Sequence, residues 1–442
     1  MRTSVGTRPV VAPEATGLPR LLAGTTANGA TVSIEDHLSR WGAPPVRTAG
    51  ADLIDKLSAA GLAGHGGAWF PVATKWRSIR GGRLRRPIVV GNGAEGEPAS
   101  SKDALLLAQL PHLVLDGATL AGAALDASRV IMHVPAPLVR GVEVAIDSRR
   151  GYGIDPIDIE VVAAPDRFIA GQESAVVSRL NGGDALPSFI GIEPIRDRGV
   201  SGRPTLVQNV ETLAHVALIA RFGPAWFRAL GTDRYPGTML ITVTGRWSDP
   251  QVFEASLGTP LRHVLTFSHL DAENYQGALL GGYGGGWVNM PTLLELGLDE
   301  HEVRRAGSSL GAGVMALLPR SVCPLVETAR VVRYMEQEGA GQCGPCVNGL
   351  AGLADTTEAL AYQLSAVRGG IQSILDLCAL IDGRGACRHP DGVTRFVRSS
   401  LSVFQDDVLT HLRGRPCQRA AAPGFLPCLR TGARSVGTGA AW

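Results

Sequence analysis

The residues best suited to chemistry are two cysteines in the C-terminal third of the chain. Cys343 and Cys346 are separated by a glycine and a proline, and Cys378 follows 32 residues later. Thiolates are the soft ligands that iron-sulfur clusters and thiophilic metals select. Apolar residues recur at spacings of three and four over 321–337, which predicts a helix leading into this loop. The pattern indicates a metal or iron-sulfur site with one cysteine fewer than a four-iron cluster needs.

The same cysteines allow three other interpretations. A redox dithiol can also read Cys-Gly-Pro-Cys, but such a motif normally follows a strand, whereas a helix is expected before this one. Zinc could be held by the pair together with Cys378 and either Cys387 or His389, although a second closely spaced pair is missing. Inert cysteines are the third interpretation, because cysteine is among the most buried residue types.

A glycine-rich loop far upstream is a second candidate site. Gly64, Gly66 and Gly67 lack Cβ atoms, so the backbone can approach a ligand closely and turn its N–H groups toward phosphate or carbonyl oxygens. The loop has neither the phosphate-loop nor the dinucleotide spacing. Taken alone, it is better explained as a structural turn.

The segment that follows the loop strengthens the case for a ligand site. A short apolar run over 87–90 predicts a strand, and the loop after it carries Asn92, Glu95 and Glu97. Ligands of open α/β sheets bind where strands end in this way. Strand patterns at 130–134 and 157–162 alternate with helical patterns at 51–60, 104–125 and 137–148. This alternation predicts an α/β domain with a largely parallel sheet.

The remaining chain divides by its patterning. Residues 1–28 lack periodicity and are expected to form a disordered arm, so the α/β domain is placed at 29–235. A strand pattern at 238–245 and a glycine-rich turn at 281–286 indicate a small α+β module over 236–318. Helical patterns fill 319–415, and 416–442 is expected to be a loose tail.

Composition limits the partners. Forty-two basic and forty acidic residues in 442 leave a formal charge of +2, so neither nucleic acid nor an anionic membrane is indicated. The seven cysteines are an odd number and gather late in the chain, unlike a secreted disulfide framework. No apolar run reaches the ~18 residues that span a bilayer. We therefore expect a cytoplasmic protein with no membrane span of its own.

Several motifs, in order, resemble one family. They are Gly64 to Pro71 with Lys75-Trp76, Asn92 with Glu95 to Pro98, Lys102-Asp103, Ala170 to Ala175, Asn209 to Thr212, Leu310 to Gly313 and Gln342 to Cys346. They resemble the NADH- and FMN-binding flavoprotein (the F-type component) of respiratory complex I and of NAD-linked hydrogenases and formate dehydrogenases. The resemblance runs from about Leu53 to Phe404. It implies a Rossmann-like FMN domain, a β-grasp (soluble-ligand-binding) module and a C-terminal four-helix bundle that holds a [4Fe-4S] cluster.

The resemblance also implies site residues. It places no side-chain acid or base in the hydride step, because the cofactor does the chemistry. The residues that it assigns to FMN and NADH are Gly64, Gly66, Gly67, Ala68, Phe70, Lys75, Asn92, Glu95, Glu97, Gly171, Glu173, Phe189, Asn209 and Thr212. Phe70 and Phe189 are expected to stack on the adenine.

The chain departs from the family at several of these positions. The family's first cluster cysteine is Ala340 here, so Cys343, Cys346 and Cys378 need a substitute fourth ligand such as Cys387, His389 or Cys323, or leave an incomplete cluster. Other differences fall within the flavin and nucleotide motifs; they are His65 for an arginine, Trp69 for a glycine, Ala94 for an acid and Gln172 for a glutamate.

The resemblance implies an NADH dehydrogenase. Such a protein passes electrons from NADH through FMN and an iron-sulfur cluster to an electron-accepting iron-sulfur protein, and would be peripheral to the membrane within a complex. A non-catalytic assembly or binding relative that has lost its flavin or cluster is the alternative. Intact Lys75, Asn92, Glu95, Glu97 and Glu173 favour the enzyme.

Overall fold

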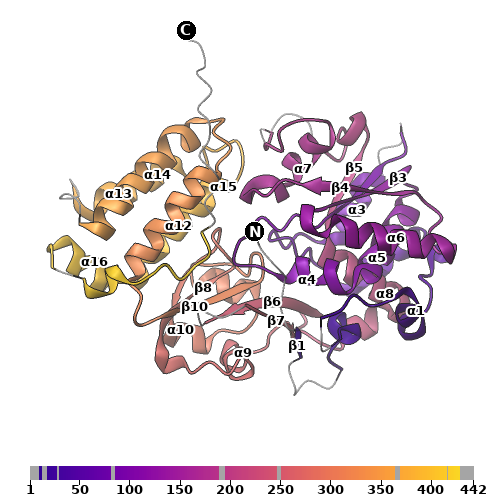
Figure 1. The fold of residues 1–442 in the computed structure, drawn as a ribbon, viewed down its shortest axis with the longest axis horizontal. Coiled ribbons are helices and arrows are strands. Elements are labelled where there is room, and N and C mark those ends of the chain that lie inside the picture. The colour runs from indigo at the N-terminus through magenta and orange to yellow at the C-terminus, as the bar shows by residue number, and fades with distance from the viewer. Residues whose placement is uncertain are drawn as a thin grey trace, which may run out of the picture.

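The structure, a computed structural model, describes residues 9–11, 17–26, 29–80, 85–188, 195–245, 250–363, 369–415 and 417–428. The predicted adenine contact Phe189 lies outside these residues. Figure 1 shows an α/β part at the right, a second sheet below the centre and a group of C-terminal helices at the left.

The first sheet has four parallel strands in the order β4-β3-β2-β5. Their bounds are β2 Ile88–Asn92, β3 Arg129–Pro135, β4 Ile159–Ala164 and β5 Thr205–Asn209. Successive side chains of a strand point to opposite faces, so Val89 joins the large core on one face while Ile88 and Val90 join a smaller cluster on the other. The prediction of an α/β fold with a parallel sheet is confirmed.

Helices cover both faces of this sheet. Helices α5 and α8 pack against each other and against β2, and Val176 and Val177 of α7 pack on the opposite face. The helices of this part are α1 Ile34–Trp41, α2 Ala51–Ala60, α3 Val72–Arg80, α4 Lys102–Gln109, α5 Pro111–Leu125, α6 Val139–Gly151, α7 Glu173–Leu180 and α8 Val210–Arg228.

The predicted helix over 104–125 is two helices, because Pro111 begins α5 after a sharp bend. Among the described residues no single helix has the length and apolar character needed to cross a bilayer, and α4 with α5, bent by 97°, passes only as a pair by length and composition.

The second sheet is mixed, with strand order β1-β7-β6-β10-β8-β9. Its strands are β1 Pro9–Val11, β6 Thr238–Thr244, β7 Gln251–Ser256, β8 Tyr275–Leu280, β9 Gly286–Asn289 and β10 Val314–Pro319. The short helices α9 Leu261–Phe267, α10 Met290–Glu295 and α11 Glu300–Arg305 belong to the same region. The strand and glycine-rich turn expected in this region are present as β6 and as the β8–β9 connection.

The N-terminal segment is not a loose arm where the structure describes it. Strand β1 pairs with β7, and Leu21 and Leu22 are buried in the main core. The buried carboxylate of Glu254 accepts hydrogen bonds from the backbone N–H groups of Arg20 (2.9 Å) and Leu22 (3.0 Å). A strand and a carboxylate distant in sequence therefore hold a segment whose own pattern predicts no structure.

The C-terminal helices form a separate layer, at the left in Figure 1. They are α12 Pro324–Glu338, a π-helical turn at Pro345–Leu350, α13 Ala351–Tyr362, α14 Gly370–Ile381, α15 His389–Val403 and α16 Gln405–Leu412. Helix α12 packs against α13 and α15, and α14 packs against the same two.

The predicted loose tail is ordered over 417–428. Phe425 and Leu426 are buried, and their N–H groups donate to the carboxylate of Glu327 on α12. The reason again lies far along the chain, because a buried carboxylate on α12 needs these donors.

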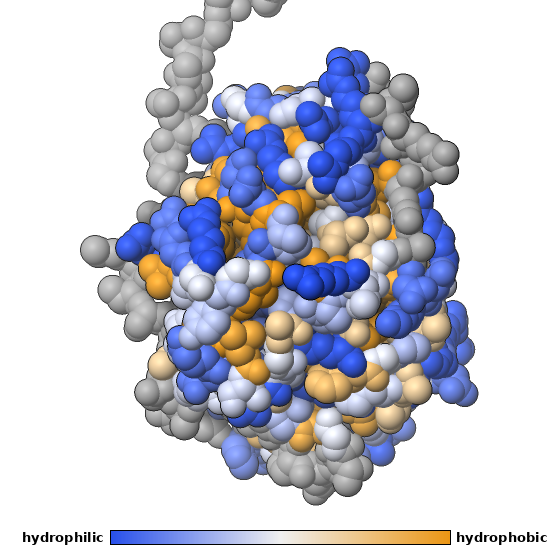
Figure 2. Space-filling view, turned by 90° about the vertical axis from the view of Figure 1, so that its right-hand side faces the viewer, coloured by the Kyte–Doolittle hydropathy of each residue, from blue (hydrophilic) through white to orange (hydrophobic). Residues whose placement is uncertain are grey.

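The outer surface of the α/β part is mixed in character. Figure 2 views the molecule from the right of Figure 1, and hydrophobic residues there are interspersed with hydrophilic ones. Helix α6 on this side keeps Val142 and Ile146 buried while Val144 is half exposed, as expected of a helix with one face toward a sheet.

Candidate functional site

The predicted cofactor residues converge on one cavity of about 780 Å³. Every one of them within the described residues lines it except Thr212. The cavity lies where β2 and β5 end, because Asn92 and Asn209 are the last residues of these neighbouring strands and are aligned in register. Carboxyl ends of parallel strands are the expected place for a ligand.

The two asparagines organise the loops around the cavity. The amide of Asn92 donates to the carbonyl oxygen of Gly171 (2.9 Å), which ties the β2 loop to the segment before α7. The carbonyl oxygen of Asn209 accepts from the N–H groups of Glu211 (3.0 Å) and Thr212 (3.3 Å) and so caps α8. Thr212 in turn accepts from the N–H of His65 (2.9 Å), which places it behind the glycine loop rather than in the cavity wall.

Glycines form a surface that side chains would fill. A Cβ on Gly96 would lie 2.1 Å from the carbonyl oxygen of Phe168, and one on Gly171 would lie 2.6 Å from that of Ala94. Gly67 has a φ of +103°, and a Cβ there would have protein atoms no nearer than 3.8 Å. The Gly67 position thus opens toward the cavity. A planar ligand that needs close backbone approach, as a flavin does, fits this surface.

The acidic residues of the cavity differ in their roles. Glu95 accepts from the N–H groups of Asp103 (3.2 Å) and Ala104 (3.1 Å), so it caps α4. Glu173 is 40% exposed and lies 3.2 Å from the ammonium of Lys75, which also donates to the Val207 carbonyl. Only Glu173 of these two presents an exposed carboxylate.

Glu97 is the buried carboxylate of the site. It accepts from the N–H groups of Tyr283 (2.7 Å) and Ala99 (3.2 Å), so it joins the β2 loop to the glycine-rich turn of the second sheet. Burial raises the pKa of Glu97 to about 7, and these two hydrogen bonds only partly oppose the rise. This carboxyl therefore changes charge near neutral pH.

A buried charged cluster beneath the glycine loop was not assigned a role from the sequence. Glu211 contacts Lys102 (2.8 Å) and His65 (3.2 Å), and His215 lies 4.0 Å from the same carboxylate. Burial opposes ionisation of Glu211, but Lys102 and His65 outweigh it and hold the pKa of the carboxyl below its usual range. Burial lowers the pKa of His215 to about 3.

These groups have the ligand types of a metal site, with ligand atoms within 4.8 Å of one another. The Lys102 ammonium already occupies the carboxylate, so the cluster supports the cavity floor rather than a cation. The motifs at 102–103 and 209–212 were the signal that could have found it.

The departures from the family pattern are accommodated locally. Trp69 takes a left-handed φ of +54°, and its indole packs against His65 and Tyr235 in the core of the second sheet. Gln172 caps α7 by accepting from the N–H groups of Ser174 (2.8 Å) and Ala175 (3.0 Å). A glutamate could accept the same two bonds, so the amide preserves the local structure.

The four predicted metal ligands lie on different elements. Cys343 and Cys346 lie at the start of the π-helical turn, Cys378 on α14 and Cys387 just before α15. Burial raises the pKa of Cys346 to about 11, and the neighbouring Cys343 and Cys387 contribute to the rise. Burial likewise raises the pKa of Cys378 to about 11, but no cysteine affects it. The structure therefore gathers Cys343, Cys346 and Cys387 more closely than Cys378.

The position of the missing cysteine is next to this group. The backbone N–H groups of Gly341 and Ala340 lie beside the Cys346 thiol and oppose the rise of its pKa. His389, the other suggested substitute, donates from Nε2 to the Met335 carbonyl oxygen (2.7 Å) and has its second ring nitrogen buried without a partner. Among the described residues, the groups of three ligand types whose ligand atoms all lie within 4.8 Å of one another include none of these four cysteines. That spacing suits a single ion, whereas a cluster is wider because each thiolate binds a different iron.

The cavity reaches the cysteine region. Cys387, His389 and Met335 line it together with the glycine loop. A flavin in the cavity and a cluster at the cysteine loop would thus be neighbours.

Comparisons with known proteins define the class first. The Nuo51 FMN-binding domain matches residues 57–218, and the NADH-ubiquinone oxidoreductase-F iron-sulfur binding region matches residues 327–411. The class is that of flavoproteins that also carry an iron-sulfur binding region. FMN and an iron-sulfur cluster were the cofactors predicted, and the matched regions confirm them for the family.

The relatives identify the family. The F subunit of the NADH-quinone oxidoreductase of Mycobacterium tuberculosis is 30% identical over 394 residues, covering 83% of this chain and 86% of the relative. The mitochondrial NADH dehydrogenase [ubiquinone] flavoprotein 1 of Dictyostelium discoideum is 26% identical over 400 residues, covering 84% and 81%. The chain belongs to the family of NADH-quinone oxidoreductase F subunits.

A solved structure agrees with this assignment. An NAD⁺-reducing [NiFe]-hydrogenase crystal structure in the air-oxidised state is similar at a TM-score of 0.77 with 26% identity. The match covers 88% of this chain and 68% of the hydrogenase chain.

Proposed function

We propose that this chain oxidises NADH through FMN bound in the 780 Å³ cavity and passes the electrons to an iron-sulfur cluster at the cysteine loop. The observation that carries the proposal is the continuity of the cavity, which is lined by the glycine loop at one end and by Cys387 at the other. Electron transfer requires the two cofactors to be close, and a shared cavity wall provides that proximity.

The chain's own residues bind and orient the reactants. Bound FMN would accept a hydride and release electrons singly, and the protein supplies position and electrostatics. Gly64 to Ala68 and Gly171 provide close backbone approach, and Asn92 holds the two loops at a fixed separation. Lys75 and Glu173 present a cation and an anion at the cavity edge, which suits the phosphate and hydroxyl groups of a nucleotide.

For the cluster we propose Cys343, Cys346, Cys378 and Cys387 as ligands. Cys387 would take the place of the ligand that Ala340 cannot supply, and its proximity to Cys343 and Cys346 supports this assignment. Binding must release the thiol protons, because the thiolate is the ligand.

The domain assignments follow the same proposal. We assign 29–235 to the FMN and NADH domain, 236–318 to a β-grasp module and 319–415 to a helical iron-sulfur bundle. The mixed sheet around β6 and β10 and the mutual packing of α12 to α15 support the last two. The electron acceptor would be an iron-sulfur protein of a larger complex at the cytoplasmic side of a membrane, in keeping with the names of the relatives.

One experiment tests the proposal directly. The visible spectrum of the protein, purified anaerobically, should show flavin bands and an iron-sulfur shoulder, and NADH should bleach the flavin bands. Iron and sulfide analysis then reports the cluster. A colourless protein that stays colourless after reconstitution with FMN, iron and sulfide would instead support the assembly or binding relative.

A further inference from the structure

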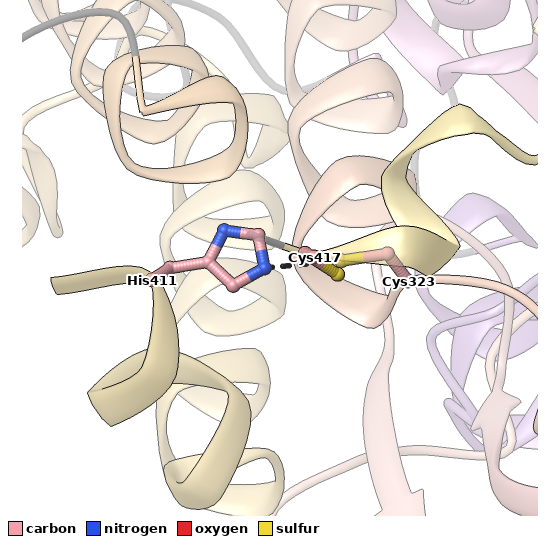
Figure 3. Close-up of side chains that lie close together, drawn as sticks. All are labelled: Cys323, His411 and Cys417. Atoms are coloured by element: carbon pink, nitrogen blue, oxygen red, sulfur yellow. Dashed lines mark hydrogen bonds between the residues drawn. The ribbon is translucent and has the colours of Figure 1, made fainter. Parts of the chain in front are cut away.

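A second group of sulfur and imidazole ligands lies away from the cavity and the cysteine loop. Cys323 precedes α12, His411 lies near the end of α16, and Cys417 precedes the short helical turn at Gln418–Ala421. Their ligand atoms all lie within 4.8 Å of one another. Figure 3 shows the three side chains pointing toward a common centre.

The geometry of the group matches a tetrahedral ion. The Cys323 sulfur lies 3.5 Å from Nε2 of His411, the contact drawn dashed in Figure 3. On a tetrahedral zinc with bonds of ~2.3 Å to sulfur and ~2.1 Å to nitrogen, two such ligands stand about 3.6 Å apart. The Cys323–His411 pair is therefore already at the separation that an ion between them requires.

The imidazole is oriented as a ligand. Nδ1 of His411 lies 3.2 Å from the carbonyl oxygen of Leu360 on α13. A carbonyl can only accept, so Nδ1 carries the proton and the lone pair of Nε2 faces the thiols. Metal-binding histidines typically have their second nitrogen held in this way.

Charge and burial favour a thiophilic divalent cation. Cys323 is fully buried, His411 is 4% exposed and Cys417 is half-buried. Two thiolates neutralise a divalent ion, so the assembled site carries no net charge in a buried place. Thiolate with imidazole is a zinc ligand set. The partial exposure of Cys417 leaves room for water at the fourth position.

We propose that Cys323, His411 and Cys417 form a zinc site that fastens the C-terminal segment to the helical layer. Zinc entry would convert two thiols to thiolates and release two protons. The site would join three points remote in sequence, and both of its cysteines lie outside the matched iron-sulfur region of 327–411. The segment after Cys417 also packs on α12 through Phe425 and Leu426, so the ion would reinforce an existing contact.

The experiment uses the full chain with its cysteines reduced. Zinc per chain is measured by elemental analysis in the wild type and in Cys417→Ser, which changes the more exposed ligand and is the variant expected to fold. Cys428→Ser is the matched control, because Cys428 lies in the same segment but outside the group. Cys343→Ser is a second control, which removes a ligand of the iron-sulfur loop instead. Cobalt(II) titration of the same proteins reports tetrahedral thiolate coordination by its visible absorption.

The expected result is one zinc per chain, lost or weakened about tenfold or more in Cys417→Ser and retained in Cys428→Ser and Cys343→Ser. Cobalt should give intense visible bands in the wild type that Cys417→Ser lacks. Equal zinc content in the wild type and Cys417→Ser would overturn the proposal. So would a wild type without the cobalt bands, or a Cys323–Cys417 disulfide found by mass analysis of the protein as isolated.

Discussion

The flavin cavity and the cysteine loop use different chemistry to build a site. The cavity is shaped mostly by backbone, with glycines that admit a ligand and with Asn92 and Gln172 holding the loops by hydrogen bonds to main chain. The cysteine loop depends on individual side chains, and one of the family's ligands is Ala340. Substitutions around the cavity leave its loops in place, whereas a lost thiol removes a bond to the cluster itself. Divergence should therefore affect the cluster before it affects flavin binding.

The largest effect is expected at the glycine loop. In Gly67→Leu the new side chain would enter the cavity from a backbone with a φ of +103°, so flavin binding should be lost. The flavin absorbance per chain of the purified protein measures this. Gly141→Leu on α6 is the control, because a Cβ there meets no atom within 4 Å and it does not line the cavity. A Gly67→Leu protein with full flavin would show that the cavity is not shaped by this loop.

At the cysteine loop, restoring a ligand should improve the site. Ala340→Cys should raise iron and sulfide per chain after anaerobic reconstitution, because Ala340 lies beside Cys346 and a thiol there would add a ligand. Cys387→Ser should lower them in the wild-type background and matter less once Ala340→Cys is present. Electron paramagnetic resonance of the reduced proteins distinguishes three-iron from four-iron clusters. No gain of iron in well-folded Ala340→Cys would contradict the alignment of this loop with the family.

The sequence predicted the cavity better than its supports. Asn92, Glu95 and Asn209 follow strands and lie beside glycines, and parallel strands bring such residues together at one edge of a sheet. The buried contact of Glu211 with Lys102 and His65 depends on how α4, α8 and the glycine loop pack, so no local spacing reveals it. For the same reason the N-terminal arm was wrongly expected to be loose, because Glu254, more than 200 residues away, anchors it.

The ligand group at Cys323 is the clearest case of this limit. Cys323, His411 and Cys417 have none of the short spacings that indicate a metal site. They meet only because the chain folds back across α12 after α16. Cys387 was within reach of prediction because it lies on the same stretch as Cys378.

A pH effect on stability is expected from Glu97. Its pKa of about 7 in the folded protein exceeds the ordinary value of 4.5 because of burial, so the protonated carboxyl stabilises the fold. That contribution is complete below pH 4.5 and is lost as the pH rises through 7, on the order of 3 kcal/mol in all. Glu97→Gln should remove this part of the pH dependence, measured by urea unfolding of flavin-free protein across that range. The control Glu160→Gln changes a half-exposed carboxylate and should keep the wild-type slope; a matching slope in Glu97→Gln would contradict the role of burial.

The smallest effect on the fold, and the sharpest on the nucleotide, is expected at Glu173. Its pair with Lys75 is partly exposed, so Glu173→Ala should change the free energy of unfolding by less than about 1 kcal/mol. A charge-assisted hydrogen bond from the carboxylate to NADH is worth ~1.5 to 3 kcal/mol, so half-maximal flavin reduction should need about tenfold more NADH or more. Flavin content should stay the same. Glu143→Ala on α6 removes a similarly exposed carboxylate remote from the cavity and should leave the NADH titration unchanged. An unchanged titration in Glu173→Ala would mean that the nucleotide does not reach the cavity edge at Lys75, and the comparison between a backbone-built flavin site and a side-chain-built cluster would then exclude NADH binding from the former.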